Sequence, residues 1–446
     1  MTTSPDDRTA GFTTRQLRTG PQSDRRVAPR ALPIHLTAGF ELADFDAAAE
    51  QFHGGDGYSY TRVANPTTDA LERRIADLEG GAEALVVGSG QAATSIALLG
   101  LLRAGDHIVS ASSIYEGTRG LLLENLSRLG ITVDFVADTS DLGAWERAIR
   151  PETRVLFGES IPNPTNDLFD IAAVADLAHE HGIPLIIDST LASPYLLRPI
   201  EHGADLVVHS ASKFLAGQGA VLGGVIVDNG RFDAERSGAL FPHLLEPDRL
   251  GGPSFWERAG GRARIAYLRD SVALRFGPTA SPLNSFLIHQ GIETLSLRVQ
   301  RQSANALAVA TWLEQRPEVE SVHYAGLASH PSHALAERYL PNGFGSVFSF
   351  TLHGGRDAAR AFVNALEFFT HMTHLGDVRS LVLHPASTSH NLRSPEEQLA
   401  AGILPGTLRV SIGIEDLPDL LADLERAVDA AREATTSTRA AQGVAA

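Results

Sequence analysis

The chain contains a single lysine, and its surroundings suit covalent chemistry. Lys213 is the only lysine among the 37 Lys and Arg residues, and it follows the apolar run Ala204–His209. Ser210 and Ser212 stand just before it. A lysine beyond a buried strand, flanked by hydroxyls and small residues, can have a lowered pKa and form a Schiff base with a carbonyl compound. A solvated loop lysine is the common alternative, and this context argues against it.

Two other predicted strand ends carry groups that suit a ligand. The apolar run Pro184–Asp188 ends in a carboxylate, which either serves a ligand or caps the next helix. After Val87 the chain passes through Ser89, Gly90 and Gln91 into a helical pattern. Small residues at a helix N-terminus let backbone N–H groups approach a phosphate. An ordinary tight turn explains this segment equally well, because its spacing matches neither a dinucleotide fingerprint nor a P-loop.

Taken together, these groups match what pyridoxal phosphate (PLP) requires. A phosphate cradle at Gly90, a carboxylate at Asp188 and an amine at Lys213 suit the phosphate, the pyridine nitrogen and the aldehyde of PLP. The carboxylate keeps the ring nitrogen protonated, which makes the ring an electron sink. The lysine can then move protons at the substrate. We therefore predict PLP as the cofactor.

The composition excludes several other classes of chemistry. The chain has no cysteine, so no disulfide, thiolate nucleophile, iron–sulfur cluster or Cys-ligated zinc can form. A net charge of −16 disfavours a protein that coats nucleic acid or an anionic membrane. Residues 84–102 are uncharged, but their Gly, Ser and Gln residues favour a buried strand and helix over a membrane span. We expect a cytoplasmic protein, because the first residues lack an apolar signal region.

The predicted elements indicate an α/β fold. Between residues 65 and 228, helical segments such as Ile171–His181 alternate with apolar runs of the kind found in sheets buried on both faces. This pattern predicts a mostly parallel, doubly wound sheet that binds ligands at the carboxyl ends of its strands. The predicted strands are Ala84–Val87, His107–Ser110, Thr132–Val136, Val155–Glu159, Pro184–Asp188, Leu206–His209 and Gly224–Val227.

We expect three parts along the chain. Residues 1–64 have weak periodicity and form an arm, residues 65–276 form a large domain with an irregular stretch at 229–276, and residues 277–446 form a smaller α+β domain. In this last part the sequence predicts, in order, a helix, two strands, a second helix and a frayed tail; the elements are Thr294–Leu313, Val319–His323, Val347–Leu352 and Leu417–Ala431.

As a set, the motifs resemble those of the Cys/Met-metabolism family of PLP enzymes, from about Thr13 to Asp429. The resemblance implies the PLP-dependent transferase fold type I, which is aspartate-aminotransferase-like, with a mostly parallel seven-stranded sheet. Tyr60 and Arg62, in Tyr-Thr-Arg-x-x-Asn-Pro-Thr, look like the family segment that binds the PLP phosphate of a neighbouring subunit. The resemblance therefore also implies an oligomer, a homotetramer made of two dimers.

The resemblance assigns roles to further residues. Lys213 and Tyr115 are the implied catalytic residues, and Tyr115 stacks on the cofactor ring. The implied substrate-binding residues are Asn163, Ser380 and Arg409, since a bidentate arginine suits a carboxylate. Besides Tyr60 and Arg62, the implied contacts to PLP come from Ser89, Gly90, Gln91, Tyr115, Asn163, Asp188, Ser210, Ser212 and Lys213.

Four positions depart from the family pattern. Ser189 stands where the family usually has Asn, Leu191 where an aromatic residue is expected, and Gln218 where His is common. Glu116 stands where Gly is usual. None of these changes removes a contact to PLP. Glu116 and Ser189 lie close to the expected site, so they bear on the choice of substrate.

The segment Leu375–Thr388 resembles the O-acetylhomoserine sulfhydrylase branch of the family. Arg379 stands where cystathionine synthases and lyases place Glu, and Gly117 stands where methionine γ-lyases usually have Cys. The resemblance implies PLP-dependent γ-replacement on O-acetyl-L-homoserine by sulfide or a small thiol, which gives L-homocysteine or methionine and acetate. A γ-lyase or γ-synthase of the same family, or another nucleophile, is the alternative.

Three histidines raise the question of a metal site. His371, His374 and His384 lie close together in the sequence, but no acidic ligand set accompanies them. Ordinary packing and hydrogen bonding explain them better. We therefore predict no metal, and we expect small-molecule substrates but no nucleic-acid or membrane partner.

Overall fold

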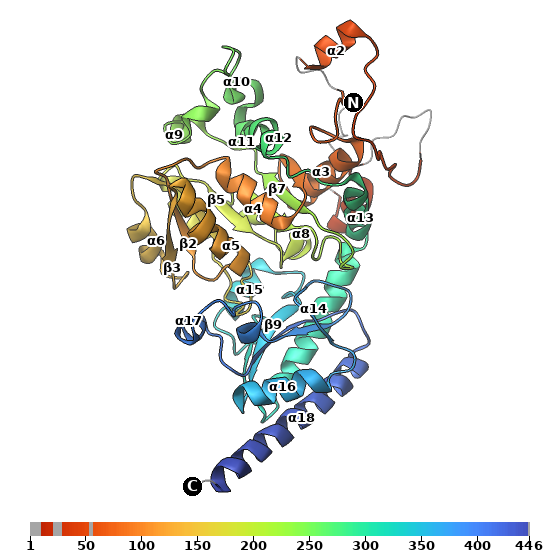
Figure 1. Cartoon of the computed structure of the whole chain (residues 1–446), viewed down its shortest axis with the longest axis vertical. Coiled ribbons are helices and arrows are strands. Elements are labelled where there is room, and N and C mark those ends of the chain that lie inside the picture. The colour runs from red at the N-terminus through yellow and green to blue at the C-terminus, as the bar shows by residue number, and fades with distance from the viewer. Residues whose placement is uncertain (1–9, 21–28, 53–56, 445–446) are drawn as a thin grey trace.

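The computed structural model describes residues 10–20, 29–52 and 57–444 of the 446-residue chain. Figure 1 shows a large domain that holds one sheet and a smaller C-terminal domain that holds another. Helix α14 (Leu295–Glu314) runs from the first domain into the second. In the described ranges, no helix is both long and apolar enough to cross a membrane.

The large domain contains the seven-stranded sheet that the sequence predicts. Its strand order is β1-β7-β6-β5-β4-β2-β3. All neighbouring strands are parallel except β7, which runs antiparallel to both β1 and β6. Six of the strands are almost wholly buried, in agreement with their apolar runs, whereas most residues of the edge strand β3 are partly or fully exposed. Their bounds are β1 (Glu83–Val87), β2 (His107–Ala111), β3 (Thr132–Val136), β4 (Thr153–Glu159), β5 (Leu185–Asp188), β6 (Leu206–Ser210) and β7 (Gly224–Asp228).

Local signals explain where the helices around this sheet begin and end. Asn65 caps α3 (Pro66–Glu79) by accepting a hydrogen bond from the Thr67 N–H. Gly80 ends the helix at φ 77°, a left-handed conformation that glycine adopts without strain. Helix α3 packs on β1 and β7, and α4 (Gly90–Leu99) packs on β6 and β7. The predicted helix after Asp170 is α7 (Ile171–Glu180).

The expectation of an irregular stretch at residues 229–276 is confirmed for residues 229–254, which hold only two short helices, and is wrong for residues 255–276, which are helical. This stretch contains a series of short helices, among them α9 (Ala234–Ser237), α10 (Phe255–Ala259), α11 (Ala263–Tyr267) and α12 (Leu274–Phe276). Ser254 and Glu257 form a capping box at the start of α10. The Ser-x-x-Glu spacing that makes this box is a signal for the start of a helix, but the glycines around it weaken the helical pattern of the sequence.

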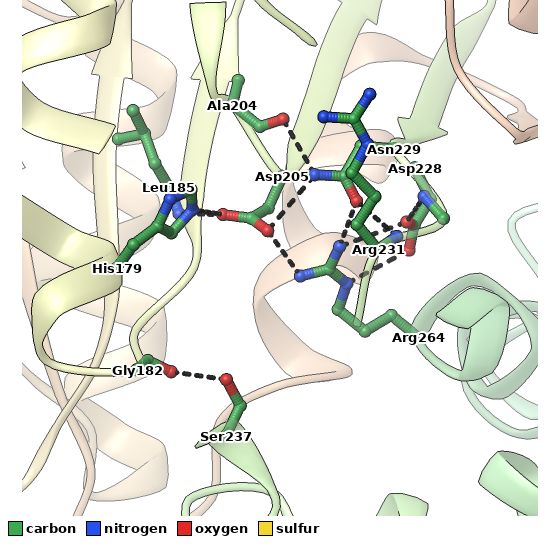
Figure 2. A network of polar contacts seen from close by, with 11 residues as sticks. His179, Gly182, Leu185, Ala204, Asp205, Asp228, Asn229, Arg231, Ser237 and Arg264 are labelled. Carbon is green, nitrogen blue, oxygen red and sulfur yellow. Dashed lines mark hydrogen bonds and ion pairs between the residues drawn. The ribbon is translucent and has the colours of Figure 1, made fainter. Parts of the chain in front are cut away.

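A buried polar network ties two helices to the edge of the sheet where β6 begins (Figure 2). Arg264 of α11 pairs with Asp205 at 2.9 Å and with Asp228 at 3.2 Å. His179 of α7 lies 2.8 Å from the other Asp205 oxygen. Burial alone would raise the pKa of Asp205, but the charge of Arg264 and the hydrogen bond from His179 lower it to about 2. This edge is opposite to the one where β5 ends at Asp188.

The C-terminal domain has a five-stranded sheet of order β10-β11-β12-β9-β8. Helices α16 (Gly355–Ala365) and α18 (Leu417–Val444) pack against each other beside it. The strands are β8 (Val319–His323), β9 (Val347–Leu352), β10 (Thr370–His371), β11 (Leu381–Leu383) and β12 (Thr407–Ser411). Helix α18 continues through most of the expected frayed tail, because no proline or glycine interrupts the sequence between Pro418 and Gly443.

Two hydrophobic cores correspond to the two sheets. The larger core includes residues of α13 (Pro282–Ile292) and of the first part of α14, such as Val299. The smaller core begins at Ala306 of α14 and includes Leu424 of α18. One helix thus contributes to both cores, and the chain passes from the large domain to the C-terminal domain within α14.

Candidate active site

A cavity of about 450 Å³ lies at the carboxyl ends of β4, β5 and β6 and is bounded on another side by the C-terminal domain. This is the edge of the sheet where ligands bind in doubly wound folds. Most of the predicted site residues line it, although they come from segments far apart in the sequence. They are Ser89, Gly90, Gln91, Tyr115, Asn163, Asp188, Ser210, Ser212, Lys213 and Arg409.

The start of α4 forms one wall of the cavity and suits an anion. The Ser89 hydroxyl accepts a hydrogen bond from the Ala92 N–H at 3.1 Å and so caps the helix. The first N–H groups of a helix have no partner within it, and the helix dipole favours negative charge there. A Cβ on Gly90 would lie 2.6 Å from the Cβ of Ser210. Glycine is therefore required for this helix to begin against the end of β6.

Two carboxylates lie side by side at the strand ends that line the cavity, Glu159 buried and Asp188 partly buried. Glu159 and Asp188 end the neighbouring strands β4 and β5 and are paired in the sheet register. Burial, together with the nearby charge of Asp188, raises the pKa of Glu159 well above its usual range. Burial also raises the pKa of Asp188, but hydrogen bonds from the Thr190 N–H and hydroxyl oppose this rise. Asp188 is the better stabilised anion of the two.

Lys213 follows the end of β6, the strand next to β5, and its amine contacts the C-terminal domain. Its Nζ is 3.1 Å from Nδ1 of His374. Burial and, to a smaller extent, the positive charge of Arg409 lower the pKa of Lys213 to about 8. Burial and the nearby Lys213 charge lower the pKa of His374 to about 4. At neutral pH the histidine is uncharged and can accept a hydrogen bond from the lysine.

Arg409 of β12 is a buried cation with spare hydrogen-bonding capacity. Its NH2 group donates to the backbone oxygens of Thr373 and His374 at 3.2 and 3.1 Å. Its Nε, like Oδ1 of Asn163 and Nε2 of His374, is buried without a hydrogen-bond partner among the described residues. Buried polar atoms normally have partners. These three atoms therefore indicate where a polar ligand completes the site.

Three predicted site residues do not line the cavity. Tyr60 is 46% exposed, and Arg62 donates a hydrogen bond to the Leu274 oxygen at 2.6 Å beside a separate, smaller pocket. Ser380 is fully buried, and its hydroxyl donates to a Glu415 carboxylate oxygen at 2.9 Å. In this chain Ser380 therefore holds the segment before β11 in place.

Several cavity residues had no role in our sequence analysis. Glu159, Thr190, His374 and His390 all line the cavity. The position of Glu159 at the end of a predicted strand was a usable signal. The sequence predicts only ordinary packing for His374, because nothing in its local pattern indicates the contact with Lys213. Among the described residues, no group of three or more His, Cys, Asp or Glu could hold a metal ion.

The cavity has the donors and acceptors that PLP requires. The start of α4 and the hydroxyl of Ser210 suit a phosphate, the Asp188 carboxylate suits a pyridinium nitrogen, and the Lys213 amine suits an aldehyde. The Ser212 hydroxyl also lines the cavity but is hydrogen-bonded to the backbone N–H and oxygen of Gly223. Residues 13–429 match the family of Cys/Met metabolism PLP-dependent enzymes. The chain belongs to this family. The predicted cofactor and family are thereby confirmed.

Several proteins are similar to this chain over nearly their whole length. An O-acetyl-L-homoserine sulfhydrylase of Corynebacterium glutamicum is 44% identical over 93% of this chain and 96% of its own. A homocysteine synthase of Schizosaccharomyces pombe is 43% identical over 94% of this chain and 98% of its own. The crystal structure of a putative O-acetylhomoserine (thiol)-lyase from Campylobacter jejuni, which carries a pyridoxyl-lysine monophosphate, matches with a TM-score of 0.88 at 34% identity, over 94% of this chain and 100% of that chain.

Proposed function

We propose that this PLP-dependent enzyme catalyses γ-replacement on O-acetyl-L-homoserine with sulfide or a small thiol, giving L-homocysteine or methionine and acetate. The names of the similar proteins support this substrate class. The structural observation that carries the proposal is the pair of cations in one cavity. Arg409 can bind the carboxylate of an amino acid, and Lys213 can transfer protons at its carbon atoms.

The proposed cofactor contacts follow from the lining of the cavity. The start of α4, with Ser89, Gly90 and Gln91, would hold the phosphate together with Ser210 and Ser212. Asp188 would pair with the ring nitrogen, Lys213 would bind the aldehyde carbon, Tyr115 would cover the ring, and Asn163 would contact a cofactor oxygen. When bound, PLP supplies an electron sink for the negative charge that develops at the substrate carbons.

The chain's own residues then bind the substrate and move its protons. Arg409 would bind the substrate carboxylate, and Asn163, which lines the same cavity and has an unpartnered Oδ1, would help to orient the substrate. Lys213 removes protons and returns them, because a pKa of about 8 leaves part of its population as free amine near neutral pH. His374 accepts a hydrogen bond from Lys213 Nζ and so orients the amine.

A second subunit would complete the phosphate site. Among the described residues that line the cavity, only Lys213 and Arg409 are Lys or Arg, and both have other proposed roles. The phosphate cradle thus has no cation of its own. Tyr60 and Arg62 lie outside the cavity, and Tyr60 is half exposed. To reach the phosphate of a neighbouring chain, Arg62 would exchange its hydrogen bond to the Leu274 oxygen for that contact. We propose at least a dimer, and a homotetramer of two such dimers.

One assay tests the proposed reaction. The enzyme is incubated with O-acetyl-L-homoserine with and without sulfide, and homocysteine, acetate, α-ketobutyrate and ammonia are measured. We expect homocysteine and acetate in equal amounts when sulfide is present. If α-ketobutyrate and ammonia predominate even with sulfide, the enzyme is a γ-lyase and the transferase proposal is wrong.

A further inference from the structure

An ion pair joins the two domains at the cavity. Glu116 begins α5 (Glu116–Gly120) directly after Tyr115 and belongs to the large domain. Arg393 belongs to the C-terminal domain and lies just before α17 (Pro395–Ala400). The Arg393 NH2 group donates a hydrogen bond to a Glu116 carboxylate oxygen, and Nε2 of His390 lies 3.5 Å from the same oxygen. Glu116 and His390 line the cavity beside Tyr115.

The charges of Glu116 and Arg393 offset each other, and of the two residues only Glu116 lines the cavity. The side chains of Glu116 and Arg393 are only 21% and 14% exposed, so solvent screens them weakly. Burial lowers the pKa of His390 to about 4, so this residue is neutral at neutral pH. Arg119 of the same helix lies over the ring of Phe135, 4.4 Å from its centroid. The pair therefore contributes one negative and one positive charge.

The pair differs from Arg409, the cation proposed to bind the substrate carboxylate. Among the described residues, Arg409 donates hydrogen bonds only to backbone oxygens, so its charge is available to a ligand. The charge of Arg393 is satisfied by Glu116, although its Nε is buried with no partner among the described residues. A negative group that enters this part of the cavity meets the Glu116 carboxylate or must displace it from Arg393.

We propose that Glu116 selects the acyl group of the substrate. By neutralising Arg393, it makes this wall of the cavity suitable for an uncharged ester such as acetyl and unfavourable for an ester with a second carboxylate, such as succinyl. The inference rests on the proposed function, because it concerns the leaving group of the same reaction. Glu116 stands where the family pattern usually has glycine, which cannot neutralise the arginine.

The test compares two substrates across a double-mutant cycle. The holoenzyme, Glu116→Gln, Arg393→Gln and the double variant are assayed for kcat/KM with O-acetyl- and O-succinyl-L-homoserine, each with sulfide. Glu116→Gln removes the carboxylate charge and leaves Arg393 charged. We expect the succinyl-to-acetyl ratio to rise at least about tenfold in Glu116→Gln, to fall in Arg393→Gln, and to return toward the wild-type value in the double variant.

Controls separate this proposal from a structural effect and from the proposed function. Glu124→Gln removes the same charge from an exposed position in the helical segment after α5 and should leave the ratio unchanged. Glu116→Gly is the second variant if Glu116→Gln does not fold. A ratio within about twofold of wild type in the folded variants, with the acetyl ester turned over, overturns the selectivity proposal alone. A wild-type enzyme that converts neither ester overturns both.

Discussion

Lys213 Nζ lies 3.1 Å from Nδ1 of His374, although the two residues are 161 positions apart in the sequence. The lysine follows β6 of the large domain, and the histidine follows β10 of the C-terminal domain. The contact therefore spans the two domains. It couples the position of the only lysine to the packing of one domain on the other.

The first prediction concerns the protonation of Lys213. Burial and the charge of Arg409 lower its pKa from 10.5 to about 8 in the cofactor-free protein. Labelled lysine gives one side-chain NMR signal, because the chain has one lysine. We expect this signal to titrate near pH 8 and to move toward higher pH in Arg409→Gln. A wild-type titration near 10.5 would contradict this.

A matched variant tests the contact with His374. His374→Asn keeps a hydrogen-bond acceptor near Lys213, whereas His374→Ala removes it. If the histidine orients the amine, we expect His374→Ala to lower kcat by at least about tenfold and His374→Asn to restore most of the loss. Equal losses in both variants would show that the imidazole acts in another way. The NMR signal of Lys213 should change its chemical shift in the alanine variant.

The second prediction concerns attachment of the cofactor. Borohydride reduction of the holoenzyme should add one pyridoxyl phosphate to the peptide that contains Lys213, and mass spectrometry detects the added mass. In Lys213→Ala this attachment should be absent, and the activity should fall by at least about a thousandfold. Because the chain has no other lysine, a pyridoxyl group attached to any lysine must be on Lys213. Full activity in Lys213→Ala would overturn the assignment.

The third prediction tests whether subunits share their sites. Arg62→Ala should bind PLP more weakly, and Lys213→Ala should be inactive. If Arg62 binds the phosphate in the site of the neighbouring chain, a mixed dimer of the two variants contains one complete site. In that site, the Arg62→Ala chain supplies Lys213 and the Lys213→Ala chain supplies Arg62. We therefore expect activity to recover when the variants are unfolded and refolded together. No recovery, or a fully active wild-type monomer in sedimentation experiments, would contradict the shared site.

The fourth prediction concerns the Arg264 network. Arg264→Ala leaves the buried carboxylates of Asp205 and Asp228 without their cation, so it should destabilise the fold by about 3–5 kcal/mol. Arg360→Ala, which breaks an exposed pair with Asp357, should change stability by at most about 1 kcal/mol. Urea unfolding of both variants measures the difference. Similar losses of unfolding free energy in the two variants would show that the buried Arg264 network stabilises the fold no more than the exposed pair does.

The same network predicts a dependence of stability on pH. The pKa of Asp205 is lowered from 3.8 to about 2 in the folded chain, so its charged form is favoured by folding. This contribution is fully present above the unfolded pKa of about 3.8 and is lost as the pH falls through about 2. Unfolding curves between pH 5 and 2, with Asp205→Asn as the control, should show a smaller pH dependence in the variant.

Residues that depend on local pattern could be predicted from the sequence. Asp188 and Lys213 were identified because each follows an apolar strand, and parallel strands place their carboxyl ends at one edge of the sheet. The glycine turn at Gly90 gave an ambiguous signal that only its contact with Ser210 explains.

Contacts between domains could not be predicted. The partners Glu116 and Arg393 are 277 positions apart, and no local periodicity reports how one domain packs on the other. Ser380 is an example in which the family resemblance implies a contact that the fold does not favour. The resemblance implies a substrate contact, but the Ser380 hydroxyl donates its hydrogen bond to Glu415 of the same domain.

Helix α14 connects the two domains through their interiors. It contributes Val299 to one core and Ala306 to the other. The larger core also includes Val347 of β9 from the C-terminal domain. Because the buried apolar packing is continuous from one sheet to the other, we expect the two domains to unfold in a single cooperative transition.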